Sequence, residues 1–159
     1  MERKYPHLIQ PITLGNVTFR NRMFASPIGA TDIDKDCVPG ERTRAFYELR
    51  AKGGAAAVTM SELVVHPETD GSHMLHLDLA TVGSLAAFTF TADAIKRHGA
   101  VPSVEFSHSG QYAGTYMADK NKKQGLTQYG PSDGVRPDGM KVTSLTKKQI
   151  ADIVKRYGE

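Results

Sequence analysis

The chain has 159 residues, of which 40% are hydrophobic and 23% are charged, and its formal net charge is +3. This size and composition suffice for one domain with a hydrophobic core, and they exclude an intrinsically disordered chain. No apolar run reaches the length of a membrane span, and the N-terminus lacks the apolar region of a secretory signal. A single cysteine, Cys37, excludes an internal disulfide. We therefore expect a soluble, cytoplasmic protein.

The first elements in chain order are short and β-prone. Residues 12–14 and 17–19 flank a Gly-Asn dipeptide, which favours a two-residue hairpin turn. Residues 22–25 predict a third strand. Pro27 should end that strand, because proline cannot donate to a sheet ladder. Residues 28–39 are then expected to form a loop.

The next stretch alternates between helical and strand patterns. Residues 40–52 and 82–98 have helical periodicity, and each is followed by glycine. Residues 55–65 and 101–106 predict buried strands, and the polar segment 66–79 predicts a loop. The apolar residues expected to face the core are Ala45, Phe46 and Leu49 in the first helix, and Leu85, Phe88, Ala92 and Ile95 in the second.

The remainder begins with a long polar segment at residues 107–144, which we expect to be a loop. Thr146 and Gln149 then match a capping box at the start of a last helix. Its apolar stripe is Ile150, Ile153, Val154 and Tyr157. The alternation of strands and helices predicts an α/β fold with a parallel sheet. Three strands leave such a sheet incomplete, so we expect the chain to be the front of a longer protein.

Four segments together resemble a known family. They are residues 8–27 (LIQPITLGNVTFRNRMFASP), 50–54 (RAKGG), 105–110 (EFSHSG, where the family has Gln-Leu-x-His-x-Gly) and 145–157. The pattern is similar to the N-terminal part of the Old Yellow Enzyme family of NADH:flavin oxidoreductases, in its 2,4-dienoyl-CoA reductase-like branch. The resemblance covers nearly the whole chain.

The resemblance implies a fold and an activity. The fold would be the N-terminal portion of a (β/α)8 TIM barrel, with about three βα units plus an N-terminal hairpin, and residues 1–159 would be a single partial domain. The barrel would bind FMN and use NAD(P)H to reduce an activated alkene of the enoate, enone or dienoyl-CoA type. This branch often appends 4Fe–4S and FAD regions beyond the part matched here. We expect the chain alone to be inactive. The protein could form a homo-oligomer.

The resemblance also implies which residues contact the flavin. These are Ser26, Pro27, Ile28 and Gly29 after the first barrel strand, Ser61 and Glu62 on the second, and Glu105 on the third. Without the resemblance, an ordinary strand-ending loop would be the preferred explanation of the first group. A charged strand terminus would explain Ser61 and Glu62 as well as a flavin contact does. Glu105 departs from the family's glutamine, because an ionised carboxylate can accept a hydrogen bond but cannot donate one. Its negative charge would lower the flavin potential. No catalytic residue is assigned.

Two other clusters favour a solvated surface. Histidines and acids at His66, Glu68, Asp70, His73, His76 and Asp78 match no zinc spacing, so we predict no metal site. The lysines are Lys120, Lys122 and Lys123, and we expect neither a nucleic-acid nor a membrane partner. His108 is expected to be a hydrogen-bonded loop residue.

Two alternative hypotheses stay open from the sequence. The chain could be an inactive half-barrel that acts only in binding or assembly. It could also be part of a different TIM-type enzyme that binds no flavin. A downstream strand with paired histidines, followed by a phosphate-binding loop, would favour the flavin enzyme.

Overall fold

The structure is a computed structural model that describes residues 4–29, 32–33, 38–66, 77–79, 81–113 and 127–158. The chain forms two compact units, one of residues 1–62 and 77–105 and the other of residues 63–76 and 106–159. Within the described residues, no helix combines the length and the hydropathy needed to cross a bilayer.

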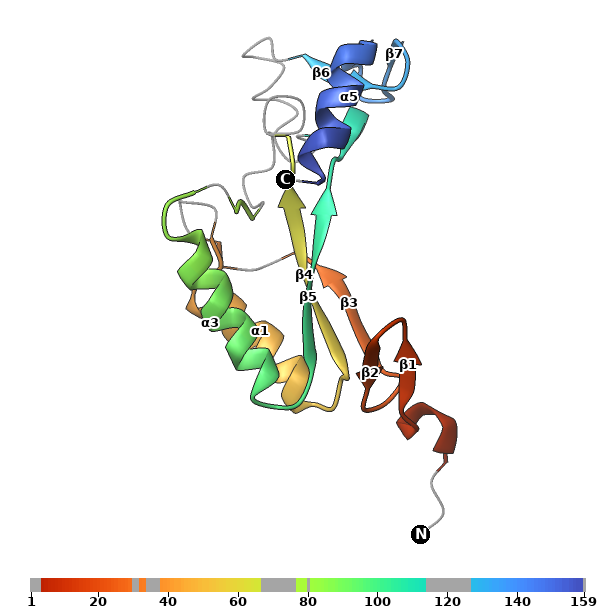
Figure 1. Cartoon of the computed structure of the whole chain (residues 1–159). Coiled ribbons are helices and arrows are strands. Elements are labelled where there is room, and N and C mark those ends of the chain that lie inside the picture. The colour runs from red at the N-terminus through yellow and green to blue at the C-terminus, as the bar shows by residue number, and fades with distance from the viewer. Residues whose placement is uncertain are drawn as a thin grey trace. The chain divides into compact units, whose positions relative to one another are not determined.

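The elements labelled in Figure 1 follow the order that the sequence pattern predicts, with several additions in the second unit. The strands are β1 (Ile12–Leu14), β2 (Val17–Phe19), β3 (Phe24–Ile28), β4 (Ala57–Val64), β5 (Val101–Ser107), β6 (Gln128–Gly130), β7 (Gly134–Val135) and β8 (Lys141–Ser144). The helices are η1 (Pro6–Ile9), α1 (Glu41–Lys52), α3 (Ser84–Lys96), η2 (Gly110–Tyr112) and α5 (Lys147–Arg156).

Strands β1 and β2 form the predicted antiparallel hairpin. Gly15 in its turn has φ of +59°, a left-handed conformation that glycine adopts without the steric penalty of a side chain. The hydroxyls of Thr13 and Thr18 lie 3.0 Å apart across the pair. The Gly-Asn signal was therefore sufficient to locate this element.

Strands β3, β4 and β5 are neighbours in one sheet, in that order. β3 and β4 are parallel, and Figure 1 shows the arrows of all three strands pointing the same way. The amide of Val101 donates to the carbonyl of Ala56, which joins the starts of β5 and β4. The predicted parallel sheet is confirmed.

Strand β3 corrects one expectation, because Pro27 lies inside the strand and does not end it. The register with β4 is irregular there: Ala25 pairs with Val58, but Ile28 pairs with Met60. Three steps along β3 therefore match two along β4, as in a β-bulge. Proline is tolerated at such a position and on an edge strand, because its missing N–H interrupts no ladder bond.

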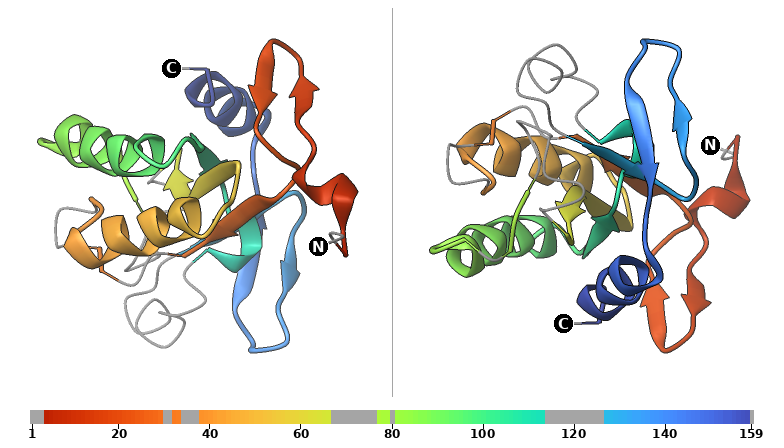
Figure 2. Two further views of the ribbon diagram at one scale, coloured as in Figure 1. Left: turned by 90° about the horizontal axis from the view of Figure 1, so that it is seen from below. Right: turned by 90° about the horizontal axis from the view of Figure 1, so that it is seen from above.

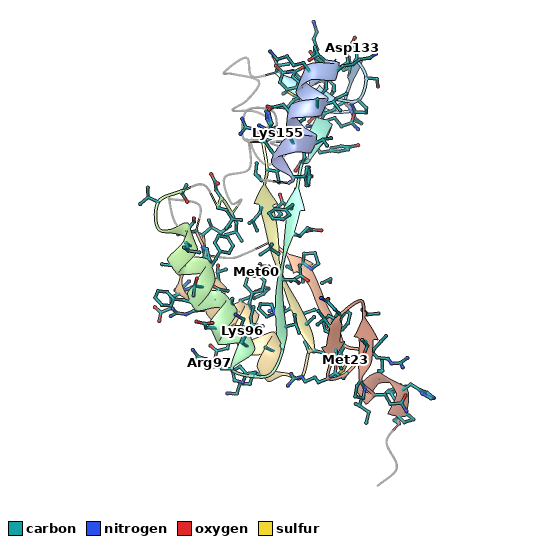
Figure 3. The ribbon with its side chains drawn as sticks, in the orientation of Figure 1. Met23, Met60, Lys96, Arg97, Asp133 and Lys155 are labelled. Atoms are coloured by element: carbon teal, nitrogen blue, oxygen red, sulfur yellow. The ribbon has the colours of Figure 1, made fainter. Side chains whose placement is uncertain are left out.

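Helices α1 and α3 lie side by side against one face of this sheet (Figures 1 and 2). The side chains of Val58 and Met60 on β4 are buried (Figure 3 labels Met60), as is Ile95 on α3. The predicted stripe on α1 was wrong, because Ala45 and Leu49 are exposed. The buried residues of α1 are Thr43, Tyr47 and Ala51. On α3, Phe88 and Ile95 are buried as predicted, whereas Leu85 is exposed.

Arg20, directly after the hairpin, ties together the segments that precede the strands. Its guanidinium donates to the carbonyls of Ala51 (2.9 Å) and Ala55 (2.8 Å) and also to that of His98. Ala55 comes just before β4 and His98 just before β5. The hairpin therefore lies at the N-terminal end of the sheet, as predicted.

Asn21 completes this anchoring from a buried position. Its Nδ2 donates to the carbonyl of Gly54 at 2.9 Å, and its Oδ1 accepts from the amide of Met23 at 2.9 Å. Asn21 thus gives a hydrogen-bond partner to one main-chain carbonyl and to one main-chain amide. Asn21 thus fixes the entry into β3 relative to the turn before β4.

The second unit contains a small sheet where the sequence predicted only a loop. Its strand order is β6-β8-β7, with β6 parallel and β7 antiparallel to β8. These strands have two to four residues, too few for a recognisable alternation. Helix α5 has the predicted capping box between Thr146 and Gln149. The predicted apolar stripe was wrong in three of its four members, because Ile153 is buried but Ile150, Val154 and Tyr157 are exposed.

Candidate functional site

The end of β3 presents polar and apolar groups together. Ser26 and Ile28 are exposed, whereas Pro27 between them is partly buried. Gly29 follows the strand, and a Cβ built on it would meet no atom of the described residues within 4 Å. The main chain is thus open to a ligand at this point.

On β4, the predicted residues Ser61 and Glu62 lie within the strand and not at its end, because β4 continues to Val64. Glu62 is partly buried, and its carbonyl accepts a hydrogen bond from the amide of Leu77 at 3.1 Å. The main-chain carbonyl of Glu62 therefore already has a hydrogen-bond partner within the protein.

Glu105 lies on the face of the sheet opposite the helices. On β5 it is two residues beyond Ser103, so the two side chains point to the same face. Ser103 is hydrogen bonded to Thr59 of β4 at 2.8 Å, whereas the neighbouring Val58 is buried on the helix side. The side chain of Glu105 is exposed. The carboxylate of Glu105 therefore lies on the face of the sheet opposite the helices.

The structure places six of the seven predicted residues on three neighbouring strands, and the seventh, Gly29, directly follows one of them. β3 carries Ser26 to Ile28, with Gly29 directly after it, β4 carries Ser61 and Glu62, and β5 carries Glu105. The C-terminal parts of parallel strands are where α/β barrels bind ligands. We call these seven residues, which lie in or directly after the C-terminal halves of the three strands, the β3–β5 rim.

Sequence reasoning missed two residues of helix α1 that hydrogen bond to the main chain near the end of β3. Thr43 and Tyr47 are buried on α1, and both hydroxyls contact main chain at or after the end of β3. The available signal was their spacing of four residues, which places them on one helix face. Both residues are polar or amphipathic, so a search for an apolar stripe passed over them.

In the second unit, His108 is a hydrogen-bonded loop residue, as predicted. Its Nδ1 accepts from the amide of Gly110 at 3.2 Å, and its ring lies 6.4 Å from that of His66. His66 is buried and lies 2.9 Å from a carboxylate oxygen of Asp152 on α5. This hydrogen bond holds the pKa of Asp152 below its ordinary value. The pair Arg156–Asp152 (3.6 Å) adds to the same effect.

The first unit has a comparable histidine–carboxylate pair. His98, after α3, lies 3.0 Å from a carboxylate oxygen of Glu48 on α1, and Arg97 lies 3.5 Å from the same oxygen. Figure 3 labels Arg97 at this end of α3. The hydrogen bond from His98 is the main cause that lowers the pKa of Glu48. These contacts link the two helices and serve the scaffold.

Several sequence predictions lie outside the described residues. They concern Cys37, the three lysines Lys120, Lys122 and Lys123, and four members of the histidine and acid cluster, Glu68, Asp70, His73 and His76. Among the residues that are described, no group of three or more potential ligands could hold a metal ion.

The comparison with protein families decides where the chain belongs. The profile of the NADH:flavin oxidoreductase / NADH oxidase family matches residues 7–159. The chain belongs to this family. Among curated members it is 23% identical to the NADH oxidase of Thermoanaerobacter brockii, over 96% of this chain and 23% of that protein. The present chain therefore spans about a quarter of the length of that relative.

Solved structures of similar fold agree. A 2-naphthoyl-CoA reductase in complex with 2-naphthoyl-CoA superimposes with a TM-score of 0.80 at 21% identity, over 96% of this chain and 24% of that chain. The Old Yellow Enzyme from Pichia sp. AKU4542 superimposes with a TM-score of 0.79 at 19% identity, over 95% of this chain and 40% of that chain. The predicted α/β fold of this barrel family is confirmed.

Proposed function

We propose that this chain supplies strands β3, β4 and β5 to the FMN-binding barrel of an oxidoreductase that uses NAD(P)H to reduce an activated alkene. The observation that carries the proposal is the β3–β5 rim, in which three parallel strands present exposed side chains such as Ser26, Ile28 and Glu105. Barrel enzymes bind their ligands at this end of the strands. Membership of the flavin oxidoreductase family supports the identity of the cofactor.

The residues of the rim fit a flat, amphipathic ring. Ile28 offers exposed apolar surface, and Glu105 offers hydrogen-bond acceptors. β3 and β5 are separated by two strand spacings, about 10 Å, a width that a three-ring heterocycle can bridge. The residues that would hold the ring are Ser26, Pro27, Ile28, Gly29, Ser61, Glu62 and Glu105. When bound, FMN would supply hydride transfer between NAD(P)H and an electron-poor alkene.

The proposal extends to substrate class and to the rest of the protein. An enone or an acyl-CoA thioester conjugated with an alkene is the substrate class we propose, and the 2-naphthoyl-CoA complex of a structural neighbour supports a thioester. Residues 1–159 would then be one part of a single cytoplasmic barrel domain. Regions binding 4Fe–4S and FAD would lie in the additional length that relatives have.

A second candidate function has one observation in its favour. Phe24 is 47% exposed and Ile28 is 50% exposed, and both lie on β3, an edge strand of the sheet. Exposed apolar side chains on a strand edge favour association with another chain. The chain could therefore act in assembly without catalysis.

The deciding experiment compares the 159-residue chain with the product of the complete reading frame. We expect the complete product to release FMN on denaturation, to be reduced by NADH or NADPH without oxygen, and to be reoxidised by a cyclic enone or an enoyl-CoA. The 159-residue chain should bind FMN weakly, lack activity and self-associate on size exclusion. A complete product without flavin would contradict the enzyme, and a monomeric 159-residue chain that unfolds cooperatively would contradict the assembly role.

A further inference from the structure

The buried face of α1 carries two hydroxyl groups that are unusual for a helix packed against a sheet. Thr43 is 0% exposed and Tyr47 is 1% exposed, and they lie four residues apart on one helix face. A buried hydroxyl is unfavourable unless it is hydrogen bonded. Their partners therefore indicate what they are for.

Both hydroxyls bond to the main chain that continues from β3. Tyr47 Oη donates to the carbonyl of Ile28 at 3.0 Å. Thr43 Oγ1 donates to the carbonyl of Asp32 at 2.6 Å and accepts from the amide of Asp32 at 3.1 Å. The helix thus holds the backbone at two points, one before and one after Gly29.

Asp32 in turn forms hydrogen bonds to the first residues of α1. Its carboxylate accepts from the amide of Arg42 at 2.9 Å, and its carbonyl accepts from the amide of Gly40 at 2.9 Å. Gly40 is the N-cap residue and has no side chain to bond the first amides of the helix, so Asp32 takes that part. The start of α1 and the segment after β3 therefore hold each other in place.

Strand pairing alone does not determine the backbone at the end of β3. The register with β4 slips between Ala25 and Ile28, so the ladder is interrupted at Ser26 and Pro27. The hydrogen bond from Tyr47 meets the chain directly after this interruption. It supplies a constraint that the ladder lacks.

We infer that Tyr47 and Thr43 are positioning residues that set the main chain of Ile28 and Gly29 against the flavin ring. This inference rests on the proposed function, because it assigns the effect of the two hydroxyls to FMN. The ring of Tyr47 fills the core whether or not the hydroxyl is present, so the hydroxyl itself can be tested separately from packing.

The test uses Tyr47→Phe and Thr43→Val in the product of the complete reading frame. Each removes a hydroxyl and keeps the shape of the side chain. Thr91→Val is the matched control, because Thr91 is also 0% exposed but its hydroxyl bonds to Ala87 within α3, at 2.9 Å. Losing one buried hydrogen bond should weaken FMN binding on the order of tenfold in Tyr47→Phe, and shift the flavin absorbance maxima and midpoint potential. Thr91→Val should change none of these.

A second readout needs no flavin. The amide of Asp32 donates to Thr43 Oγ1, so its hydrogen exchange should quicken on the order of tenfold in Thr43→Val and stay slow in Thr43→Ser, which keeps the hydroxyl. Unchanged FMN affinity, spectrum and potential in a folded Tyr47→Phe protein would overturn the inference. A wild-type protein that carries no FMN would overturn the proposed function, and the flavin role of these residues with it.

Discussion

The two ends of the β3–β4–β5 sheet are held in different ways. At the N-terminal end, Arg20 and Asn21 bond directly to the carbonyls that precede the strands. At the C-terminal end, the side chains of Ser26, Ile28 and Glu105 in the β3–β5 rim are exposed. The support for this end comes from helix α1, through the buried hydroxyls of Thr43 and Tyr47. Side chains cover the main chain at the N-terminal end of the sheet, whereas several side chains at the C-terminal end are exposed.

This difference separates stability from binding. Direct bonds at the N-terminal end lock the strands, because they use the main-chain groups of the turns. Indirect support at the C-terminal end fixes the backbone of the rim without occupying the surface that a ligand would contact. Changes at the first end should therefore alter the free energy of unfolding alone, and changes at the second should also alter the cofactor.

The largest effect is expected from Asn21→Ala at the N-terminal end. It removes the side-chain partner of the Met23 amide and of the Gly54 carbonyl in a partly buried site. The free energy of unfolding should fall by about 2–3 kcal/mol, measured by urea denaturation, and the flavin potential should not change. Asn16→Ala in the exposed hairpin turn is the control. A changed potential would mean that the two ends are coupled.

A somewhat smaller loss is expected from Gly40→Ala behind the rim. The new Cβ would lie 2.5 Å from a carboxylate oxygen of Asp32 and 2.9 Å from its carbonyl oxygen, so Asp32 must move. The expected destabilisation is about 1–3 kcal/mol, with weaker FMN binding. Gly29→Ala is the matched control for stability, because its Cβ would meet nothing within 4 Å. Equal thermal midpoints for both variants would refute this account of the cap.

Glu105→Gln should act on the cofactor with little change in stability. The side chain is exposed, so the substitution buries no group and opens no cavity. Removing a negative charge near the ring should raise the midpoint potential by on the order of tens of millivolts. A redox titration of both proteins at one pH gives the answer. An unchanged or lowered potential would show that Glu105 does not face the flavin.

The smallest effect is expected from Glu48, and it depends on pH. The folded-state pKa of Glu48 is lowered, chiefly by the hydrogen bond from His98, so the pair stabilises the fold above the unfolded pKa. This contribution is lost as pH falls through the folded pKa, which lies below the ordinary carboxyl value. The thermal midpoint of Glu48→Gln should therefore lie below wild type near neutral pH and approach it in acid. A difference that stays constant from neutral pH to acid would contradict the linkage.

Local pattern was enough to determine much of this protein. The Gly-Asn turn located the hairpin, the capping box located α5, and the alternation of periods located α1, β4, α3 and β5. Each of these signals depends on residues that are close in sequence, so the sequence contains it in full. The residues expected to contact a flavin, among them Ser26 to Gly29 and Glu105, came from the resemblance to a family and not from these local patterns.

Only the tertiary structure decided how the strand ends are held. Pro27 stays within β3 because the register with β4 slips there, and register depends on a partner strand some 30 residues away. The inward face of α1 is set by the hydroxyls of Thr43 and Tyr47, which have their partners in another segment. The bonds of Arg20 likewise reach residues distant in sequence. Such contacts leave no local period, because the free energy they contribute arises only when the segments meet.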